Sequence, residues 1–250
     1  MKKILLIFSL VPLLAWGQQD LMVPIDGGTY LPLYGTGDSV EVDAFAMDKY
    51  PVTNAQFLEF VKENERWRKS KIMGLFADDN YLQDWEGDLQ LGDLARPQWP
   101  VNNVSWHAAK NYCECQGKRL PTVHEWEFAA MADESQPDAR QDEDYTKYIL
   151  SWYETPKAYA KEVGNTYENY WGIWDLHGLV WEWTQDFNSV MLVSDAATPG
   201  AENARYCDPG AVTTDDMIDY AAFMRYAFRG TQEPPYTSRN LGFRCVKDLE

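Results

Sequence analysis

The sequence predicts a single α+β domain with few helices and a large share of irregular structure. Three observations support this: strand-like segments lie near the N-terminus, three short helices carry their own capping residues, and a long Trp- and Gly-containing segment follows no regular period. The 250 residues contain no internal repeat and no Pro/Gly/Ser-rich linker. We therefore expect one domain over residues 18–250, preceded by an export signal over residues 1–17.

The first 17 residues have the three parts of a cleavable signal peptide. Lys2 and Lys3 give a positive start, residues 4–16 an apolar run, and residues 15–17 (Ala-Trp-Gly) a small-x-small cleavage motif. The apolar run is shorter than the roughly 20 residues that span a bilayer. No cysteine lies at the cut site to carry a lipid. The sequence therefore predicts a periplasmic or secreted protein without membrane insertion.

The charge of the chain disfavours two classes of partner. Acidic residues number 39 against 22 basic ones, a net charge of −17, and loss of Lys2 and Lys3 with the leader, which holds no acidic residue, makes it −19. Such a surface repels phosphate backbones and anionic lipid. We therefore expect no nucleic acid or membrane surface as partner, whereas cations or a protein partner are compatible with this charge.

The N-terminal third predicts strands followed by a helix. Residues 23–34, with Gly27-Gly28 between two apolar runs, predict a strand, a turn and a strand, and residues 40–47 alternate as one further strand. Thr53 has the position of a helix N-cap. The apolar face of that helix is formed by Ala55, Phe57, Leu58, Phe60 and Val61.

The rest of the chain predicts two more helices set among loops. Residues 69–100 are irregular and acidic and predict an ordered surface loop, whereas residues 133–144 predict a polar, mobile one. Ser105 caps a helix through Cys113, and Thr122, with capping-box spacing to Glu125, caps another through Ala130. After Trp171 only short apolar segments follow. The 11 Trp and 15 Tyr residues are expected mainly in the core, because such a domain must bury apolar surface without long helices.

The four cysteines predict disulfides in an exported protein. Cys113 and Cys115 are too close to pair without strain, so each is expected to reach Cys207 or Cys245, which leaves two pairings open. A thiolate copper site at residues 113–115 (Cys-Glu-Cys) is the less favoured alternative, because thiols in an oxidising compartment are converted to disulfides.

Several segments, in chain order, resemble the sulfatase-modifying-factor family, whose best-known members are formylglycine-generating enzymes. The most distinctive are Gly-Lys-Arg-Leu-Pro-Thr at 117–122, Trp-Glu-Trp at 181–183 and Asn-Leu-Gly-Phe-Arg-Cys at 240–245. The matching segments are 25–30, 45–57, 100–106, 112–113, 117–122, 125–130, 175–183 and 240–245. The resemblance implies an elaborated, loop-rich C-type-lectin-like fold. It also implies that Cys113 pairs with Cys245, which leaves Cys115 with Cys207.

The resemblance also shows where this chain departs from the family. Family enzymes oxidise a substrate cysteine with two cysteines that bind copper(I), a metal that prefers soft thiolates. Alignment on Arg229 and on residues 242–244 (Gly-Phe-Arg) places those cysteines at Asp216 and Ala221. An aspartate offers only hard oxygen and an alanine offers no ligand. Bound copper and standard formylglycine synthesis are therefore not expected.

Two other metals known from the family have different prospects here. His107, His124 and His177 fall in separate motifs without ligand spacing, so a histidine-bound iron is not expected. The family's calcium site precedes the Trp-Glu-Trp run, and calcium accepts carboxylates and carbonyls together. The predicted structural calcium ligands are Asp175, the carbonyls of Gly178 and Val180, and Glu182. The alternative is that Asp175 only forms a turn and that Glu182 pairs with an arginine.

The resemblance therefore predicts a pseudoenzyme: an accessory protein that binds a peptide or protein partner in the cell envelope. The runs 175–183 and 220–229 resemble a bacterial branch associated with copper nitrite-reductase or copper-delivery proteins, which suggests a partner from such a system. The expected groove is formed by Trp181, Asp216, Tyr220, Arg225 and Arg229. For the two arginines, bracing of acidic loops by charge-assisted hydrogen bonds is the favoured role, and peptide binding is the alternative. The alternative function is a copper- and oxygen-dependent oxidase with relocated ligands, Cys115 and Cys207.

Overall fold

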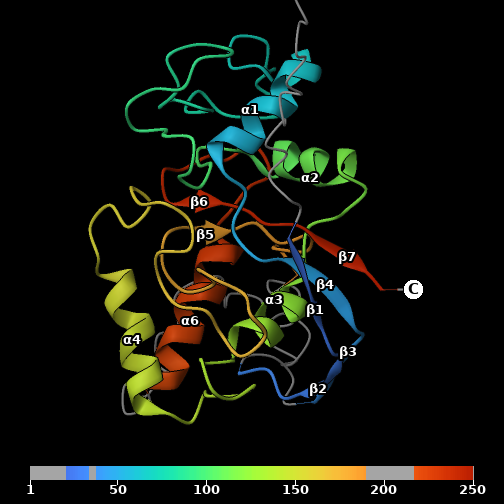
Figure 1. Cartoon of the computed structure of the whole chain (residues 1–250), viewed down its shortest axis with the longest axis vertical. Coiled ribbons are helices and arrows are strands. Elements are labelled where there is room, and N and C mark those ends of the chain that lie inside the picture. The colour runs from blue at the N-terminus through green and yellow to red at the C-terminus, as the bar shows by residue number, and fades with distance from the viewer. Residues whose placement is uncertain (1–20, 34–37, 190–216, 250) are drawn as a thin grey trace, which may run out of the picture.

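The structure is a computed structural model that describes residues 21–33, 38–189 and 217–249 (Figure 1). The predicted signal peptide lies outside these residues. Short strands and helices are joined by long irregular segments, so the predicted loop-rich α+β class is confirmed. In the described part of the chain, no helix has the length and apolar character needed to cross a membrane.

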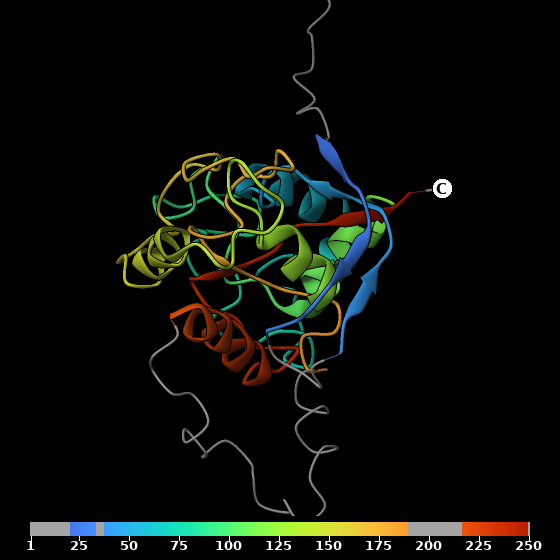
Figure 2. The same cartoon turned by 90° about the horizontal axis from the view of Figure 1, so that it is seen from below.

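The two ends of the described chain meet in a three-stranded antiparallel sheet. Its central strand carries Met47, which lies opposite Val23 on one edge strand and opposite Val246 on the other. Figure 2 shows the first and last strands of the chain on the same side of the molecule. The strands of this sheet are β1 (Met22–Ile25), β4 (Phe45–Asp48) and β7 (Val246–Asp248).

The prediction of one strand over residues 40–47 was wrong. The chain forms β3 (Val40–Val42), which pairs with β2 (Gly28–Tyr30) in a separate sheet, and then changes sheet at residues 43–44 to enter β4. Gly27 packs against this crossing, where a Cβ atom would lie 2.4 Å from the carbonyl oxygen of Val42. Apolar residues lie on both sides of the break with no glycine or proline between them, so the sequence alone does not reveal a change of sheet.

The three predicted helices are confirmed together with their caps. The hydroxyls of Thr53, Ser105 and Thr122 each accept a hydrogen bond from the backbone N–H three residues later. Thr53 with Gln56, and Thr122 with Glu125, form complete capping boxes. The helices are α1 (Asn54–Glu63), α2 (Trp106–Cys115) and α3 (Val123–Ala130), and a short 3₁₀ helix, η1 (Glu65–Trp67), follows α1.

Two helices were not predicted. Helix α4 (Glu143–Tyr153) begins inside the polar segment assigned to a loop, because the Asp142 carboxylate accepts hydrogen bonds from the first-turn N–H groups of Asp144 and Tyr145. Helix α6 (Met217–Gly230) covers the region for which only short apolar segments were expected. The two helices pack against each other (Figure 1).

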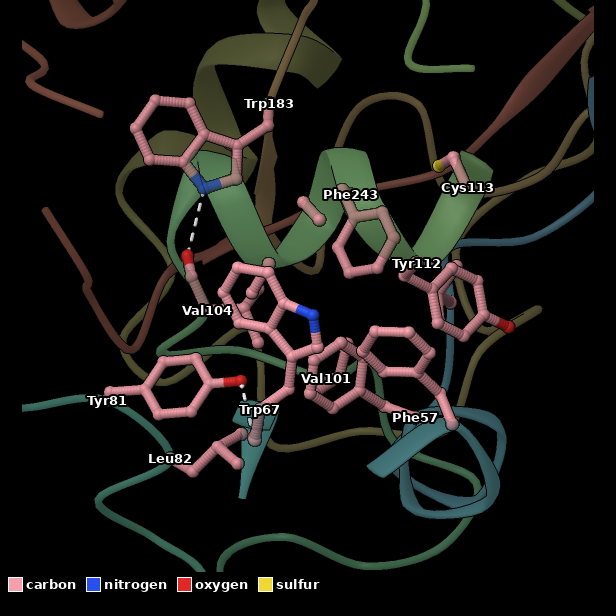
Figure 3. Packing of buried hydrophobic residues seen from close by; sticks show 14 of the residues in the cluster. Phe57, Trp67, Tyr81, Leu82, Val101, Val104, Tyr112, Cys113, Trp183 and Phe243 are labelled. Carbon is pink, nitrogen blue, oxygen red and sulfur yellow. Dashed lines mark hydrogen bonds between the residues drawn. The ribbon is translucent and has the colours of Figure 1, made fainter. Parts of the chain in front are cut away.

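Aromatic side chains form much of the larger core, as predicted (Figure 3). Phe57 of α1 stacks on Tyr112 of α2, with ring centroids 5.8 Å apart, and meets Phe243 edge to face at 6.1 Å. The irregular segment 69–100 contributes Tyr81, whose hydroxyl donates to the carbonyl of Trp67 at 3.0 Å. Buried aromatic residues with satisfied polar atoms thus anchor a loop that has little secondary structure.

The predicted pairing of Cys113 with Cys245 is confirmed. The disulfide joins α2 to the residue before β7, over a sequence separation of 132. Cys115, at the end of α2, is exposed and forms no disulfide with any described residue. Its predicted partner, Cys207, lies outside the described residues, so this second pairing stays a prediction.

A short parallel sheet brings the distinctive motifs together. Strand β5 (Trp181–Glu182) pairs with β6 (Leu241–Gly242), and the N–H of Trp181 donates to the carbonyl of Asn240 at 2.7 Å. At Gly242 a Cβ atom would lie 2.6 Å from the carbonyl oxygen of Val101, so only glycine permits this approach. The segments before β5 and β6 consequently lie beside each other and form one wall of the cleft described next.

Candidate functional site

A cleft of about 400 Å³ lies among α3, α4, α6 and the segments that precede β5 and β6. Its volume falls in the range of small-ligand sites, roughly 300–1,000 Å³. Residues far apart in the sequence meet here, because the β5–β6 pairing forms one wall and α4 supplies another. The lining residues are Trp126, Trp152, Tyr153, Thr155, 157–159, 176–181, Arg225 and 238–240.

Several aromatic side chains line the cleft. The indole of Trp181 is stacked between Tyr153 and Phe228, with ring centroids 4.8 and 4.7 Å away. Both faces of Trp181 are therefore covered, which leaves its edge to line the cleft. Trp152 of α4 is half-buried and carries the Lys161 ammonium 4.7 Å from its ring centroid.

Beneath the cleft, α3 and α6 are joined by a buried ion cluster. The Glu127 carboxylate accepts hydrogen bonds from Nε and Nη2 of Arg225, at 3.0 and 2.7 Å, and from Nη1 of Arg229 at 2.6 Å. Burial opposes the charged form of Glu127, but the two arginines outweigh it and hold the pKa of its carboxyl at about 2. Burial disfavours the charge on Arg225, yet the Glu127 carboxylate raises its pKa well above the ordinary value.

The structure places only some residues of the predicted groove at this cleft. Trp181 and Arg225 line the cleft, and Nη1 of Arg225 donates to the hydroxyl of Tyr153 at 3.4 Å. Arg229 is 5% exposed, does not line the cleft and pairs with Glu127, which agrees with the favoured bracing role rather than with an open peptide-binding group. Tyr220 is 43% exposed and is not a lining residue either. Asp216 lies outside the described residues.

Ala221, one of the two positions aligned with family cysteines, is buried. It is 3% exposed and packs in a small apolar cluster with Ala139, Tyr145 and Ile149. It also borders a small pocket of about 20 Å³, which is enough for roughly one water molecule. His177 lies against the same pocket. The methyl group of Ala221 offers no ligand to a metal there.

The three histidines lie in separate environments. His177 is buried, its Nε2 donates to the carbonyl of Ala130 at 2.7 Å, and burial together with nearby Arg225 lowers its pKa to about 3. His124 Nδ1 lies 2.8 Å from the hydroxyl of Tyr30. His107 packs between the rings of Phe76 and Trp106, and burial and Lys110 lower its pKa. Over the described ranges, no group of three or more His, Cys, Asp or Glu residues is arranged to hold a metal.

Glu182, a predicted calcium ligand, is held by an arginine. Nε and Nη2 of Arg244 donate to its two carboxylate oxygens at 2.8–3.0 Å, and Nε1 of Trp126 donates to Oε2 at 2.8 Å. The side chains of Glu182 and Arg244 are both 0% exposed. A carboxylate engaged by a guanidinium in this way does not fit a shared cation, because the cation would repel the arginine at close range.

Asp175, the second carboxylate of the predicted calcium set, is held by a loop. Its oxygens accept hydrogen bonds from the backbone N–H groups of Gly164, Asn165 and Thr166 and from the hydroxyl of Thr166, at 2.5–3.2 Å. Both carboxylates of the predicted calcium site are thus already engaged in hydrogen bonds, whereas Gly178 and Val180 line the cleft. These residues do not fit a calcium ion, so their contacts argue against the predicted site, and a melt with and without a chelator tests this.

Sequence reasoning missed the residues that give the site its charge. Glu127 was noted only as part of a family motif, and Lys157 and Arg239 were not considered. One signal was present: Arg225 and Arg229 are four residues apart, which places both on one face of a helix, where they can share a buried carboxylate. The identity of that carboxylate depends on a contact across 98 residues, and no local pattern reveals it.

Comparison with known proteins agrees with this architecture. Residues 12–249 match the family described as "Sulfatase-modifying factor enzyme 1-like domain". The chain is 30% identical to the "Formylglycine-generating enzyme" of Streptomyces coelicolor, over 91% of this chain and 83% of that one. It is 29% identical to the "Inactive C-alpha-formylglycine-generating enzyme 2" of Bos taurus, over 92% and 89%. Relatives named as formylglycine-generating enzymes and relatives named as inactive thus occur at the same level of similarity.

Among solved structures, the chain is similar to PvdO from Pseudomonas aeruginosa, with a TM-score of 0.48, 18% identity and coverage of 91% of this chain and 94% of that one. The family match over nearly the whole sequence is the stronger finding. The predicted elaborated C-type-lectin-like fold is confirmed with it. The chain belongs to the sulfatase-modifying-factor family, with the fold of the formylglycine-generating enzymes.

Proposed function

We propose that this protein is an exported accessory protein that binds a protein or peptide partner in the cell envelope and does not generate formylglycine. The observation that carries the proposal is the buried Ala221 at a position aligned with a metal-binding cysteine. Copper(I) needs soft thiolate ligands, and a methyl group packed among apolar side chains supplies none. The Asp216 substitution at the other aligned position points the same way.

The retained cleft supports a role in binding. It combines aromatic side chains with polar and charged ones, and both kinds of group can contact a ligand. The ion cluster of Glu127, Arg225 and Arg229 fixes α6 against α3, so the cleft is held by buried charge-assisted hydrogen bonds. A partner from a copper or nitrite-reductase system, suggested by the branch resemblance, remains part of this proposal.

The alternative oxidase with relocated cysteines finds less support. Cys115 is exposed at the end of α2 and is not among the residues that line the cleft. An oxidase based on Cys115 and Cys207 would need a site apart from this cleft. We therefore prefer the binding role.

The activity part of the proposal is tested with a peptide that contains Cys-x-Pro-x-Arg. The mature protein is incubated with the peptide, copper and oxygen, and the products are measured by mass spectrometry, with the Streptomyces coelicolor enzyme as positive control. We expect the peptide mass to stay unchanged. Conversion of the thiol to an aldehyde would overturn the proposal, as would stoichiometric copper(I) bound with a thiolate absorption band.

The binding part is tested by partner capture with two matched tryptophan variants. Trp152 lines the cleft and Trp99 does not, yet both are half-buried and both carry a cation over the ring, Lys161 at 4.7 Å and Arg96 at 5.2 Å. We expect Trp152→Ala to abolish cross-linking to the envelope partner and Trp99→Ala to retain it. Equal loss or equal retention in both variants would contradict a role for the cleft.

A further inference from the structure

The cleft has the opposite charge from the rest of the chain. Although the protein carries a net charge of −17, the described residues that line the cleft include three basic side chains, Lys157, Arg225 and Arg239, and no Asp or Glu. His177, which also lines it, is neutral at ordinary pH because burial lowers its pKa. Electrostatic interactions are screened over about 8 Å at physiological salt, so the sign of the charges at the cleft, and not the net charge of the chain, decides which ligands it attracts.

The buried ion cluster holds one more positive charge than negative charge. Glu127 is a single carboxylate, whereas Arg225 and Arg229 are two guanidiniums, and all three side chains are no more than 8% exposed. Within the described residues, neither arginine forms an ion pair with another carboxylate. Excess buried charge is unfavourable unless a counterion approaches. Arg225 lines the cleft, and its Nη1 donates to the hydroxyl of Tyr153, another lining residue, so this arginine is where such an anion can reach the cluster.

Lys157 supplies a second positive charge at the cleft. It is exposed and forms no ion pair with a described residue, whereas the Arg239 guanidinium is already bound by Asp84 at 2.7 Å. Its backbone φ of +54° lies in the left-handed region, which is uncommon for a residue other than glycine. Such conformations gather at functional sites, where the surrounding structure imposes them. The loop therefore holds Lys157 at the cleft at some conformational cost.

Flat apolar walls adjoin these charges. Trp152, Tyr153 and Tyr159 line the cleft beside Lys157 and Arg225. Aromatic rings of this kind pack well against a proline or another aromatic ring. The cleft thus combines a site for an anion with an apolar surface next to it.

We propose that the cleft binds an acidic peptide segment whose carboxylate reaches Lys157 and Arg225 while a neighbouring proline or aromatic side chain packs on Trp152 and Tyr159. The proposal rests on the proposed function and names the chemistry of the partner. The volume of about 400 Å³ suits a few residues of an extended chain.

The test measures the affinity of the mature protein for three labelled peptides by fluorescence anisotropy. The probe is acetyl-Asp-Pro-Tyr-Asp-amide, and its counterparts carry Asn or Lys in place of both Asp residues. We expect the acidic peptide to bind about tenfold more tightly than the Asn peptide, with weaker binding as salt increases, and the Lys peptide to bind least. Equal affinity for the three peptides would overturn the proposal.

Two charge-reversal variants form a matched pair. Lys157→Glu places a negative charge at the cleft, whereas Lys147→Glu makes the same change in net charge on α4, where Lys147 is 52% exposed and does not line the cleft. We expect Lys157→Glu to weaken binding of the acidic peptide about tenfold or more, and Lys147→Glu to leave it unchanged. Equal weakening in both would indicate only the net charge of the chain and would contradict the proposed site.

A competition arm separates a peptide from a small carboxylate. We expect N-acetylglutamate to displace the acidic peptide only at far higher concentration, and displacement at equal concentration would overturn the assignment to a peptide.

Failure of this inference is distinguishable from failure of the proposed function. If the acidic peptide does not bind but Trp152→Ala still abolishes partner capture, only the ligand chemistry is wrong, whereas oxidation of the cysteine peptide removes the proposed function itself.

Discussion

Arg244 and Glu182 form a fully buried, two-point ion pair that links the C-terminal segment to β5. Nε and Nη2 of Arg244 reach the two carboxylate oxygens at 2.8–3.0 Å, and neither side chain is exposed. Arg244 also donates to the carbonyls of Asp48 and Trp174, and Trp126 of α3 donates to the same carboxylate. One buried pair therefore fixes β4, β5, α3 and the end of the chain relative to one another.

Removal of one partner of this pair should strongly destabilise the protein. In Glu182→Gln, Arg244 keeps its charge in a buried position without a counterion, so we expect the free energy of unfolding to fall by about 3–5 kcal/mol. Urea unfolding measures the change. Glu65→Gln, which breaks the pair with Arg68 where the Glu65 side chain is 74% exposed, is the control and should cost about 1 kcal/mol or less. Similar losses of unfolding free energy in both variants would contradict a larger contribution from the buried pair than from the exposed one.

A chelator should leave the melting temperature unchanged. The Glu182 carboxylate is engaged by Arg244 and Trp126, and the Asp175 carboxylate by the N–H groups of residues 164–166, so removal of calcium should take away no stabilising contact. Differential scanning fluorimetry with and without EDTA checks this expectation. A fall in the melting temperature that added calcium reverses, and that is absent in Glu182→Ala, would instead support the calcium site predicted from the family.

The capped helices could be predicted from the sequence because their signals are local. Thr53 and Thr122 each accept a hydrogen bond from a residue three positions away, and such spacing is visible in the sequence. Helix α4 was missed because its apolar face is short: Tyr145, Thr146 and Ile149 are its buried residues, and packing against α6 supplies the rest of its stability.

The site was predicted less well than the fold, because its key contacts are long-range. Arg225 was selected from the family alignment, but its partner Glu127 is 98 positions away. A guanidinium looks the same in the sequence whether it faces a groove or a buried carboxylate. The same reason applies to Glu182. It was expected to bind a cation, and its partner in the structure, Arg244, is 62 positions away in the sequence.

His177 should make the protein less stable as the pH falls below neutrality. Burial lowers its pKa from 6.5 to about 3, so the unfolded chain binds a proton that the folded chain excludes. The stabilising contribution is therefore fully present above pH 6.5 and declines as the pH falls towards about 3, at about 1.4 kcal/mol per pH unit. Unfolding curves of the wild type and His177→Gln at pH 7, 6 and 5 measure the slope. We expect a shallower slope in the variant, and identical slopes would contradict this role for His177.

The pKa of Glu127 predicts a second loss of stability at lower pH. Its folded pKa of about 2 lies below the ordinary 4.5, so the ion cluster stabilises fully above about pH 4.5 and loses this effect between pH 4.5 and 2. Glu127→Gln should therefore destabilise the protein at pH 7, where two buried arginines lose their counterion, and flatten the pH dependence below pH 4.5. Thermal melts from pH 5 to 2.5 test this, and an unchanged acid slope would argue against the cluster.

The disulfide between Cys113 and Cys245 should contribute substantially to stability, because it closes a long loop. For a sequence separation of 132, loop-closure entropy gives about 4–5 kcal/mol, and the measured value is commonly smaller. We expect the double variant Cys113→Ala with Cys245→Ala to lose about 2–5 kcal/mol in urea unfolding. Met73→Ala, which removes the sulfur atom of a residue that is 60% exposed and takes part in no disulfide, is the control.

A count of free thiols in the wild type and in Cys115→Ala decides whether Cys115 pairs with Cys207. If Cys115 pairs with Cys207, as the sequence predicts for an oxidising compartment, neither native nor denatured wild-type protein should contain a free thiol, and Cys115→Ala should expose one. Reaction with a thiol reagent followed by mass spectrometry measures both. Two free thiols in the wild type would contradict the second disulfide while leaving the first intact, because Cys113 and Cys245 would still resist the reagent. That result would also restore the thiolates that the relocated-cysteine oxidase requires, so this count bears on the function as well as on the fold.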